Sequence, residues 1–539
     1  MDMSPAFQTR LASYLEQEGA KHGIPGRAIA LTDRSRTIYT AVHGYANLDL
    51  RAPVTADTLF EIGSISKSFT AIALLQLHEA GRLDLHAPVT EYLPWWEVRS
   101  QFAPITLHHL LCHTAGIING SDPSPDAAYE VWSLRWTEAC SPPGARFHYS
   151  NVGYKALGLV LEAVYAKPYG EILRERVLIP LGMGQTHPTI THAIRPRMAV
   201  GYDPLYDDRP YGPGQPLAPA TWLEYGNGDG SIASTASDMA TYARMLLNRG
   251  EFLGGSLLTP KGFALLTLRA AESADEVHGT FYGYGLSVHE IDGRACLSHG
   301  GGMVGYQAHL LVDMDQGLGV VVLVNGPGEP EEIARFALRL WGAERNGSDP
   351  AAVAPRPLAV CKAPLSDYVG EYQGVSRSFR LDLVGDELTM AYAGRQVHLH
   401  PRGPDRFSVD DPDFNRYPLT FAREDGRVVE ACHGPDGYPA SGSAGAPAIE
   451  PPPTWQAFVG HYRSHNPWLT NFRVVLRKGA LVYIPADNDE ELLSPVDDHE
   501  FRVGQDPQSP ERIRFETVVD GQALKANLSG CDYYRTFTP

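Results

Sequence analysis

Apolar residues follow two different periods in the first part of the chain. Strand-like runs lie near both ends of this part, at residues 28–32 and 37–42 and again at 308–312 and 319–324. Helical spacing of apolar residues is found between and after these runs, and it covers residues 64–80, 154–166, 237–247 and 331–341. This order predicts an α/β (α+β) unit, in which one sheet is built from both ends of the segment and a helical insertion lies between them.

The last part of the chain shows short alternating runs that are broken by Gly, Asp and Pro, and it contains an internal repeat. Residues 368–372 (YVGEY) match residues 458–462 (FVGHY), and the runs that follow match in the same order. The runs at 419–421 and 513–515 each precede a turn with Asp-Gly. The pattern predicts two small antiparallel β-barrels, because closure removes the exposed edges of so short a sheet.

Two proline-rich segments separate these parts. Residues 348–358 (SDPAAVAPRPL) and 446–454 (APAIEPPPT) have the composition of extended linkers. They divide the chain into three predicted domains, at residues 1–347, 359–445 and 455–539.

Charge and composition argue against several classes of protein. There are 45 basic and 63 acidic residues, for a net charge of −18, and no run of Lys or Arg, which disfavours a nucleic-acid binder. No apolar run approaches the roughly 18 residues of a membrane span, and the N-terminus has the pattern of an amphipathic helix and not of a signal peptide. The cysteines are scattered and form no C-x-x-C, which favours free thiols and a cytoplasmic location.

The strongest chemical signal is the pair Ser64 and Lys67. Gly63 permits a tight turn, Ser64 is expected to open a helix, and Lys67 follows one turn later on the same face. Lys67 is the one formal charge between residues 64 and 78, so burial should lower its pKa and let it take the proton of the Ser64 hydroxyl. No other Lys in the chain has Ser three residues before it.

Tyr149 and Asn151 form a second candidate cluster, in a turn before a predicted helix. A tyrosine beside a lysine relays a proton to a leaving group, and Asn orients Lys67 or a substrate amide. The alternative interpretation is a buried core tyrosine, since Tyr-x-Asn also occurs at 45–47 and 225–227.

A third cluster begins at His299 and continues into Gly301 and Gly302. Glycines here would let a substrate backbone approach the strand closely, and the Gly302 N–H is expected to join that of Ser64 in an oxyanion hole. The alternative is a glycine-rich hairpin with a structural histidine.

In this order, Ser64-x-x-Lys67, Tyr149-x-Asn151 and His299-x-Gly301 resemble the motifs of the serine β-lactamase and penicillin-binding-protein superfamily, specifically its class C-like serine hydrolases. Flanking segments match as well, and the resemblance covers residues 5–345. It implies a β-lactamase/transpeptidase-like fold and acylation of Ser64, followed by hydrolysis or acyl transfer. It also implies that Lys67 is the base and Tyr149 the proton relay, aided by His299, with no cofactor.

One departure from the superfamily bears on the substrate. Many β-lactamases and carboxypeptidases have Lys-Thr-Gly at the third motif, where the cation helps to hold a substrate carboxylate, and this chain has His-Gly-Gly. The departure favours amidases, aminopeptidases and esterases. With two appended lipocalin-like barrels, the layout resembles bacterial D-aminopeptidases, in which a loop of the last barrel restricts the active site to substrates with a free amine.

We therefore predict a cytoplasmic D-aminopeptidase that acts on a small peptide, amide or ester. We expect it to bind neither nucleic acid nor membrane, and a homodimer is its candidate assembly. The alternatives are an esterase and a peptide cyclase or acyltransferase of penicillin-binding type. A non-catalytic ligand-binding protein on a hydrolase scaffold is the alternative from another class.

The final barrel supplies one candidate contact to the substrate. Residues 485–491 (PADNDEE) carry four carboxylates, whereas the matching turn of the first barrel, 393–395 (AGR), is neutral to basic. A solvated acidic turn is one interpretation. The other is that Asp487 pairs with the α-ammonium group of the substrate.

A group of possible metal ligands lies at His108, His109, Cys112 and His113. The segment is rich in leucine and no second ligand pair follows at zinc-finger spacing, so we interpret it as structural and predict no metal site.

Overall fold

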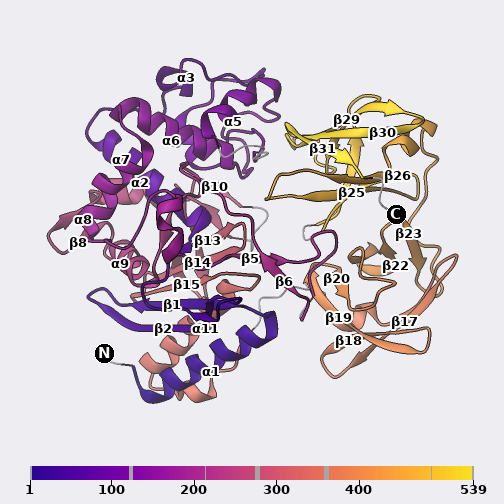
Figure 1. Cartoon of the computed structure of the whole chain (residues 1–539), viewed down its shortest axis with the longest axis horizontal. Helices are drawn as coiled ribbons and strands as arrows, with labels where there is room; N and C mark the ends of the chain where they lie inside the picture. The colour runs from indigo at the N-terminus through magenta and orange to yellow at the C-terminus, as the bar shows by residue number, and fades with distance from the viewer. Residues whose placement is uncertain are drawn as a thin grey trace. The chain divides into compact units, whose positions relative to one another are not determined.

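The computed structural model describes residues 3–120, 126–212, 214–273, 279–356, 363–486 and 489–536. The chain divides into two units: Met1–Asp203 with Leu217–Arg356, and Pro204–Pro216 with Pro357–Pro539 (Figure 1). The predicted boundaries keep residues 204–216 in the first domain, whereas by their contacts these residues group with the C-terminal part of the chain.

A nine-stranded antiparallel sheet forms the centre of the first unit. Its order is β10 (Ala271–Glu272), β11 (Phe281–Tyr282), β12 (Ser287–Ile291), β13 (Arg294–Met303), β14 (Tyr306–Asp313), β15 (Leu318–Val324), β1 (Gly26–Thr32), β2 (Thr37–Asn47) and β3 (Ala52–Pro53). β1 pairs with β15 so that Arg27 lies opposite Val324 and Thr32 lies opposite Gly319. The prediction of one sheet built from both ends of the segment is thus confirmed.

Helices cover both faces of this sheet. α1 (Pro5–His22) and α11 (Pro330–Arg345) pack on one face, where alternate residues of β1 and β15 join them in one apolar core. α9 (Ala236–Leu247) packs on the opposite face, where a Cβ atom at Gly319 would lie 2.8 Å from the Ala243 side chain. The other helices are α2 (Ser66–Glu79), α3 (Val89–Tyr92), α4 (Leu107–Leu111), α5 (Ala127–Ser133), α6 (Asn151–Tyr165), α7 (Tyr169–Leu173), α8 (Ile179–Leu181) and α10 (Pro260–Leu266).

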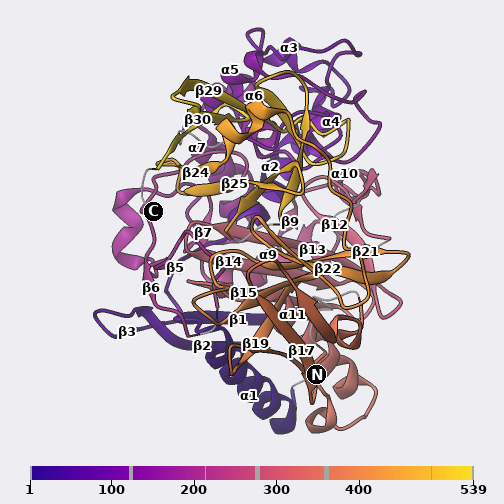
Figure 2. The same ribbon diagram turned by 90° about the vertical axis from the view of Figure 1, so that its right-hand side faces the viewer.

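α1 and α11 lie side by side, as Figures 1 and 2 both show. The ring of Phe7 meets that of Trp341 at 6.5 Å between centroids, and the ring of Tyr14 meets that of Phe336 at 4.0 Å. Because contacts that advance along α1 step backward along α11, the two helices run antiparallel. These aromatic pairs fix the spacing between the first and last helices of the unit.

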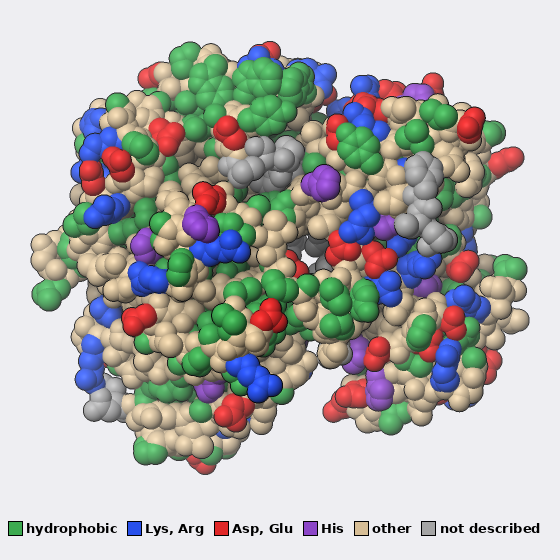
Figure 3. Space-filling view, viewed as in Figure 1, with side chains coloured by type: hydrophobic (Ala, Val, Ile, Leu, Met, Phe, Trp, Pro, Cys, Tyr) green, Lys and Arg blue, Asp and Glu red, His purple; other side chains and the backbone are tan. Residues whose placement is uncertain are grey.

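Aromatic side chains gather on the surface of the helical insertion. Tyr129, Trp132 and Trp136, on α5 and the turn after it, are exposed together with Trp95, and the rings of Trp132 and Trp136 lie 4.8 Å apart. Figure 3 shows a broad apolar area over α3 and α5, at the upper left. No helix in the described residues combines the length and the apolar character that a bilayer crossing requires.

The second unit contains two eight-stranded antiparallel sheets in which successive strands are neighbours. The first runs through β16 (Gly370–Gln373), β17 (Ser378–Val384), β18 (Glu387–Tyr392), β19 (Arg395–Gly403), β20 (Arg406–Val409), β21 (Leu419–Glu424), β22 (Arg427–His433) and β23 (Asp436–Pro439). The second is a closed barrel of β24 (Gly460–Arg463), β25 (Asn471–Arg477), β26 (Ala480–Pro485), β27 (Glu491–Pro495), β28 (Glu500–Val503), β29 (Arg512–Val519), β30 (Gln522–Leu528) and β31 (Cys531–Arg535).

The predicted fold class is confirmed, with one barrel closed and the other nearly closed. In the first barrel the ends meet through a bridge between Tyr372 and Ala440. The repeated tyrosine makes the same bond in both copies: Tyr372 OH donates to Tyr368 O at 2.8 Å, and Tyr462 OH donates to Phe458 O at 2.9 Å.

Side chains fill both barrels. The interior of the closed barrel is lined by buried aromatic residues, namely Phe458, Tyr462, Phe472, Phe501, Phe515 and Tyr533. The first barrel has the same kind of core, with Tyr368, Tyr372, Phe379, Phe407, Phe414, Phe421 and Tyr438. The barrels are therefore packed domains, as small eight-stranded barrels commonly are.

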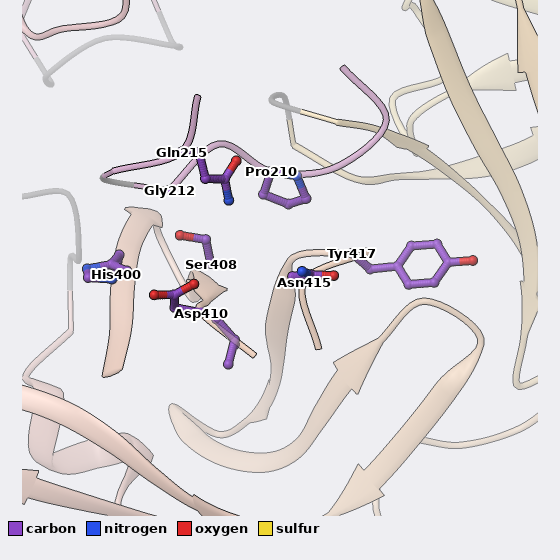
Figure 4. A pocket seen from close by; sticks show the side chains of 9 residues that line it. Pro210, Gly212, Gln215, His400, Ser408, Asp410, Asn415 and Tyr417 are labelled. Carbon is purple, nitrogen blue, oxygen red and sulfur yellow. The ribbon is translucent and has the colours of Figure 1, made fainter. Parts of the chain in front are cut away.

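Residues 204–216 form a segment that packs on both barrels. Asp207 accepts hydrogen bonds from Arg463 and, at 2.7 Å, from Thr470 Oγ1 of the closed barrel. Tyr211 O accepts a bond from Arg402 of the first barrel. Figure 4 shows Gln215 facing Ser408 and Asp410 across a cavity of about 10 Å³, which has room for about one water molecule.

Candidate active site

Ser64 lies in a 3-10 turn, Gly63–Ile65, that leads directly into α2. Ile62 N donates to Ile232 O at 3.0 Å, and Ile232 N donates to Ser66 Oγ at 3.2 Å, so both sides of the turn are held by the segment before α9. Ser64 is partly exposed. The serine thus sits at the head of an apolar helix, as expected, and its hydroxyl is accessible.

The glycine run at 300–302 packs against this turn. The sequence left a hairpin as the alternative, but the glycines lie inside β13, and the turn to β14 is made by Val304 and Gly305. A Cβ atom at Gly63, where φ is +52°, would lie 2.8 Å from Gly302 N. A Cβ atom at Gly301 would lie 1.9 Å from the carbonyl oxygen of Ile62. The strand needs glycine because its backbone touches the backbone of the serine turn.

Lys67 is fully buried and its amine contacts three oxygen atoms. Nζ lies 3.0 Å from Ser64 Oγ, 2.7 Å from Asn151 Oδ1 and 2.9 Å from the backbone oxygen of Asp229. The amide and backbone oxygens hold the amine in place beside the Ser64 hydroxyl. The sequence did not single out the Asp229 carbonyl, since a backbone atom leaves no signature in residue type.

Tyr149 and Asn151 come from the turn before α6 and the first residue of that helix. Lys67 Nζ lies 5.0 Å from the centroid of the Tyr149 ring. The helix is capped by Ser150, whose Oγ accepts from Gly153 N at 3.1 Å, and this cap directs Asn151 toward Lys67. Ser64, Lys67, Tyr149 and Asn151 are therefore brought together, although residues 67 and 151 lie far apart in sequence.

His113 supports this arrangement from behind. Its Nδ1 accepts a hydrogen bond from Ser150 N at 3.0 Å, and its ring lies 4.2 Å from that of Tyr149. Burial, with a contribution from Lys67, holds the pKa of His113 well below its usual range, so the ring is neutral. His113 positions both Tyr149 and the helix that carries Asn151.

The other members of the 108–113 segment have local partners. His108 Nδ1 lies 2.7 Å from Tyr284 OH, and His109 Nδ1 accepts from Thr106 N at 3.1 Å in a capping box for α4. The Cys112 thiol donates to His108 O at 3.0 Å. These bonds direct the side chains to different neighbours. In the described residues, no disulfide joins Cys112, Cys140, Cys296, Cys432 and Cys531, and Cys361 lies outside the described residues.

His299 lies on β13, where both ring nitrogens are engaged. Nδ1 lies 2.5 Å from Gly300 O, which only accepts, so Nδ1 carries the proton. Nε2 therefore accepts the hydroxyl proton of Tyr282, at 2.8 Å. Burial, together with Lys67, lowers the pKa of His299 to about 3. A neutral imidazole thus occupies the position of the third motif. The Gly300 carbonyl sets its tautomer, and Tyr282, which no sequence motif marks, donates to the other ring nitrogen.

Tyr282→Phe should raise the pKa of His299, because it removes a donor that stabilises the neutral ring. The buried nitrogen then lacks this bond, at a cost of about 1–3 kcal/mol. We expect the acidic limb of the pH profile of kcat/KM to move to higher pH. The matched control is Tyr284→Phe. This variant removes a similar contact, between Tyr284 OH and His108, and should leave the acidic limb of the profile in place. Equal shifts in both variants would contradict the assignment.

The acidic segment of the last barrel is only partly described. Asp487, the predicted partner of a substrate amine, lies outside the described residues. Asp489 pairs with Arg406 at 3.1 Å, and Glu490 pairs with Arg477 at 2.6 Å and accepts from Thr420 Oγ1 at 2.9 Å. The two carboxylates contact side chains of the first barrel; the Asp489 side chain is 70% exposed, whereas that of Glu490 is largely buried.

Comparisons of sequence and structure show which known proteins this chain resembles. The sequence profile of the family described as Beta-lactamase matches residues 11–342. Penicillin-binding protein 4 of Amycolatopsis lactamdurans is 27% identical over 360 residues, which are 64% of this chain and 93% of that protein. Penicillin-binding protein 4* of Bacillus subtilis is 25% identical over 429 residues, 74% and 90% of the two chains. The solved structure of the octameric penicillin-binding protein homologue from Pyrococcus abyssi is 26% identical, with a TM-score of 0.60, and covers 80% of this chain and 99% of its own.

Proposed function

The chain belongs to the beta-lactamase family and is a serine hydrolase of the β-lactamase and penicillin-binding-protein superfamily, and from this premise we propose that Ser64 attacks amide bonds that follow an N-terminal D-residue. The observation that carries the proposal is the buried Lys67 amine, 3.0 Å from a partly exposed Ser64 Oγ at the head of a helix. An amine and a hydroxyl at this distance form an activated nucleophile.

In the proposed reaction, Lys67 takes the Ser64 proton as Oγ bonds to the substrate carbonyl. The Ser64 and Gly302 N–H groups stabilise the oxyanion, and the position of Gly302 beside the Gly63 turn supports this role. Tyr149 relays the proton that Lys67 took from Ser64 to the leaving amine as the amide bond breaks, so that Lys67 returns to its neutral form. Water then attacks the acyl-enzyme, releases the acid and restores Ser64. Asn151 holds Lys67 in place through its 2.7 Å contact.

The neutral His299 supports a substrate without a carboxylate at this position. A ring with a pKa of about 3 carries no charge near pH 7, so it offers no cation to an anionic group. This favours aminoacyl amides over β-lactams and peptides that end in a free carboxylate. We therefore propose that the site recognises amine and amide groups of the substrate.

The experiment combines active-site labelling with a substrate panel. A fluorophosphonate probe should add its mass at Ser64 of the wild-type chain and leave Ser64→Ala unlabelled. D-Ala-p-nitroanilide should be cleaved faster than its L-isomer, its N-acetyl derivative, p-nitrophenyl esters and thioesters. Full turnover by Ser64→Ala would overturn the mechanism, and a preference for esters would overturn the assignment of substrate.

Asp487→Ala provides a separate test of the free-amine preference. We expect weaker hydrolysis of D-aminoacyl amides, because loss of a buried partner to an ammonium group costs about 2–5 kcal/mol of binding. N-acylated and simple ester substrates should be unaffected. Asp489→Ala is the matched control, since that carboxylate is already paired with Arg406. Equal losses on free-amine and N-acylated substrates would contradict the role of Asp487.

The alternatives differ in what accepts the acyl group or what is bound. An esterase and a peptide cyclase or acyltransferase share the acyl-enzyme. The ester substrates of the panel identify an esterase, and an added amine acceptor identifies a cyclase or acyltransferase. A ligand-binding protein with an apolar ligand inside its barrels is less well supported, because buried aromatic side chains fill both interiors.

Self-association is part of the proposal, since the Pyrococcus abyssi homologue is described as octameric. Light scattering should give a mass that is a multiple of 58.9 kDa. A mass of one chain would contradict it, and a mass of two chains would select the homodimer. We also propose a cytoplasmic location, which fits the absence of disulfides among the five described cysteines.

A further inference from the structure

Three side chains with metal-binding atoms converge between α1 and α11, on the sheet face that these two helices cover. Glu18 and His22 are one turn apart on α1 and so project from the same face of the helix. Glu332 faces them from the first turn of α11. One atom from each residue lies within 4.8 Å of the other two, and both glutamates are at least 94% buried.

The contact within this group has the geometry of two ligands that share one ion. His22 Nε2 lies 3.2 Å from Glu18 Oε2. Two ligands about 2.0–2.1 Å from one tetrahedral zinc ion lie about 3.3 Å apart. Glu18 Oε2 is buried between His22 Nε2 at 3.2 Å and Lys21 Nζ at 3.6 Å, so a metal ion bound there would take the place that the Lys21 ammonium group now holds.

The charge at this point also calls for a cation. Lys21 Nζ lies 3.6 Å from Glu18 Oε2 and 3.8 Å from Glu332 Oε2, which is beyond hydrogen-bond distance for both oxygens. The Lys21 side chain is 52% exposed, so it can turn into solvent without crossing the core. An ion-pair cluster around Lys21 is therefore the competing explanation, and the two explanations differ in what Lys21 does to metal affinity.

We propose that Glu18, His22 and Glu332 form a binding site for a divalent transition-metal ion of the zinc class. One imidazole nitrogen and two carboxylate oxygens suit Zn²⁺ and Co²⁺, whereas Mg²⁺ and Ca²⁺ prefer shells of oxygen alone. The site joins the first and last helices of the unit. Because the antiparallel aromatic pairs Phe7–Trp341 and Tyr14–Phe336 already set the helix spacing, little reorganisation is needed for the third ligand to reach the ion.

The test is titration of the chelator-treated full-length chain with ZnCl₂ by calorimetry, together with the absorption spectrum after addition of CoCl₂. We expect one site that is lost in His22→Gln and weakened at least tenfold in Glu18→Gln and Glu332→Gln. Cobalt should give visible bands in the wild type that disappear in His22→Gln. Zinc should raise the unfolding temperature of the wild type but not of His22→Gln, since an ion bound to the folded state alone stabilises it.

Lys21→Met separates the metal site from the ion-pair cluster, because loss of the competing ammonium should strengthen zinc binding several-fold. His398→Gln is the matched control: His398 and Glu387 form an exposed pair at 3.1 Å, and this substitution should not change zinc affinity at the proposed site. Absence of zinc binding in the wild type would overturn the proposal. So would an affinity that is the same in His22→Gln, Glu332→Gln and the wild type, or one that Lys21→Met leaves unchanged or lowers.

Discussion

Lys67→Met is expected to slow acylation of Ser64 about a thousandfold, since loss of a positioned general base typically costs 10²–10⁴ in rate. Methionine keeps most of the buried volume but removes the amine that faces Ser64 Oγ at 3.0 Å. It also leaves Asn151 Oδ1 and Asp229 O without this donor, which should lower the stability by about 1–3 kcal/mol for each group.

The rate of fluorophosphonate labelling reports this effect directly, and kcat/KM for D-Ala-p-nitroanilide confirms it. Lys167→Met is the control, because Lys167 is exposed and pairs with Glu175 at 2.6 Å. Circular dichroism shows whether Lys67→Met is folded. Labelling of a folded Lys67→Met at the wild-type rate would contradict the role of Lys67 as the base.

Glu61→Gln is expected to make the chain more stable than the wild type as the pH rises. Glu61 is 5% exposed and lies three residues before Ser64, and burial raises its pKa from 4.5 to about 8. Below pH 4.5 the carboxyl is protonated in both the folded and the unfolded chain. Between pH 4.5 and 8 the unfolded chain releases the proton and the folded chain keeps it, so the wild type loses about 1.4 kcal/mol of stability per pH unit.

Glutamine has no proton to lose, so the difference in stability should grow to several kcal/mol by pH 8 and then level off. Calorimetric unfolding temperatures of both proteins between pH 5 and 9 measure it. Glu251→Gln, at an exposed position, is the control and should differ from the wild type by a constant amount. A pH-independent difference for Glu61→Gln would show that Glu61 is ionised in the folded chain.

Local rules were sufficient where neighbouring residues decide the structure. The Asp-Gly turns of the repeat form with φ of +49° and +78° at residues 425 and 426, and +48° and +73° at residues 520 and 521. These values are those of the tight hairpin turn that this dipeptide favours. The helix predicted at 237–247 begins where Thr235 Oγ1 accepts from Asp238 N at 3.2 Å. The Asp238 carboxylate, in contrast, accepts a hydrogen bond from Gln185 N at 2.9 Å, and Gln185 belongs to a loop that is distant in sequence.

Predictions were less complete where the role of a residue depends on a contact with a residue far away in the sequence. Gly301 is compatible with a hairpin turn or with a strand, and the contact with Ile62, far away in sequence, is what requires glycine within β13. Tyr282 has no local pattern that marks it, because its role depends on the pairing of β11, β12 and β13 around His299. Residues 204–216 (PLYDDRPYGPGQP) are rich in Pro and Gly, which indicates a loop but not its partners, and their contacts with both barrels come from the fold of distant strands.

The sequence by itself determined the sheet built from two chain ends, the two repeated barrels and the order of the motifs at Ser64, Tyr149 and His299. These features rest on periodicity and on short spacings, which the chain carries locally. Only the tertiary structure decided that Lys67 is fully buried against Asn151, that His299 is neutral, and that Glu332 meets Glu18 and His22. Burial, pKa and convergence depend on which distant residues pack together, and no local pattern of residues contains that information.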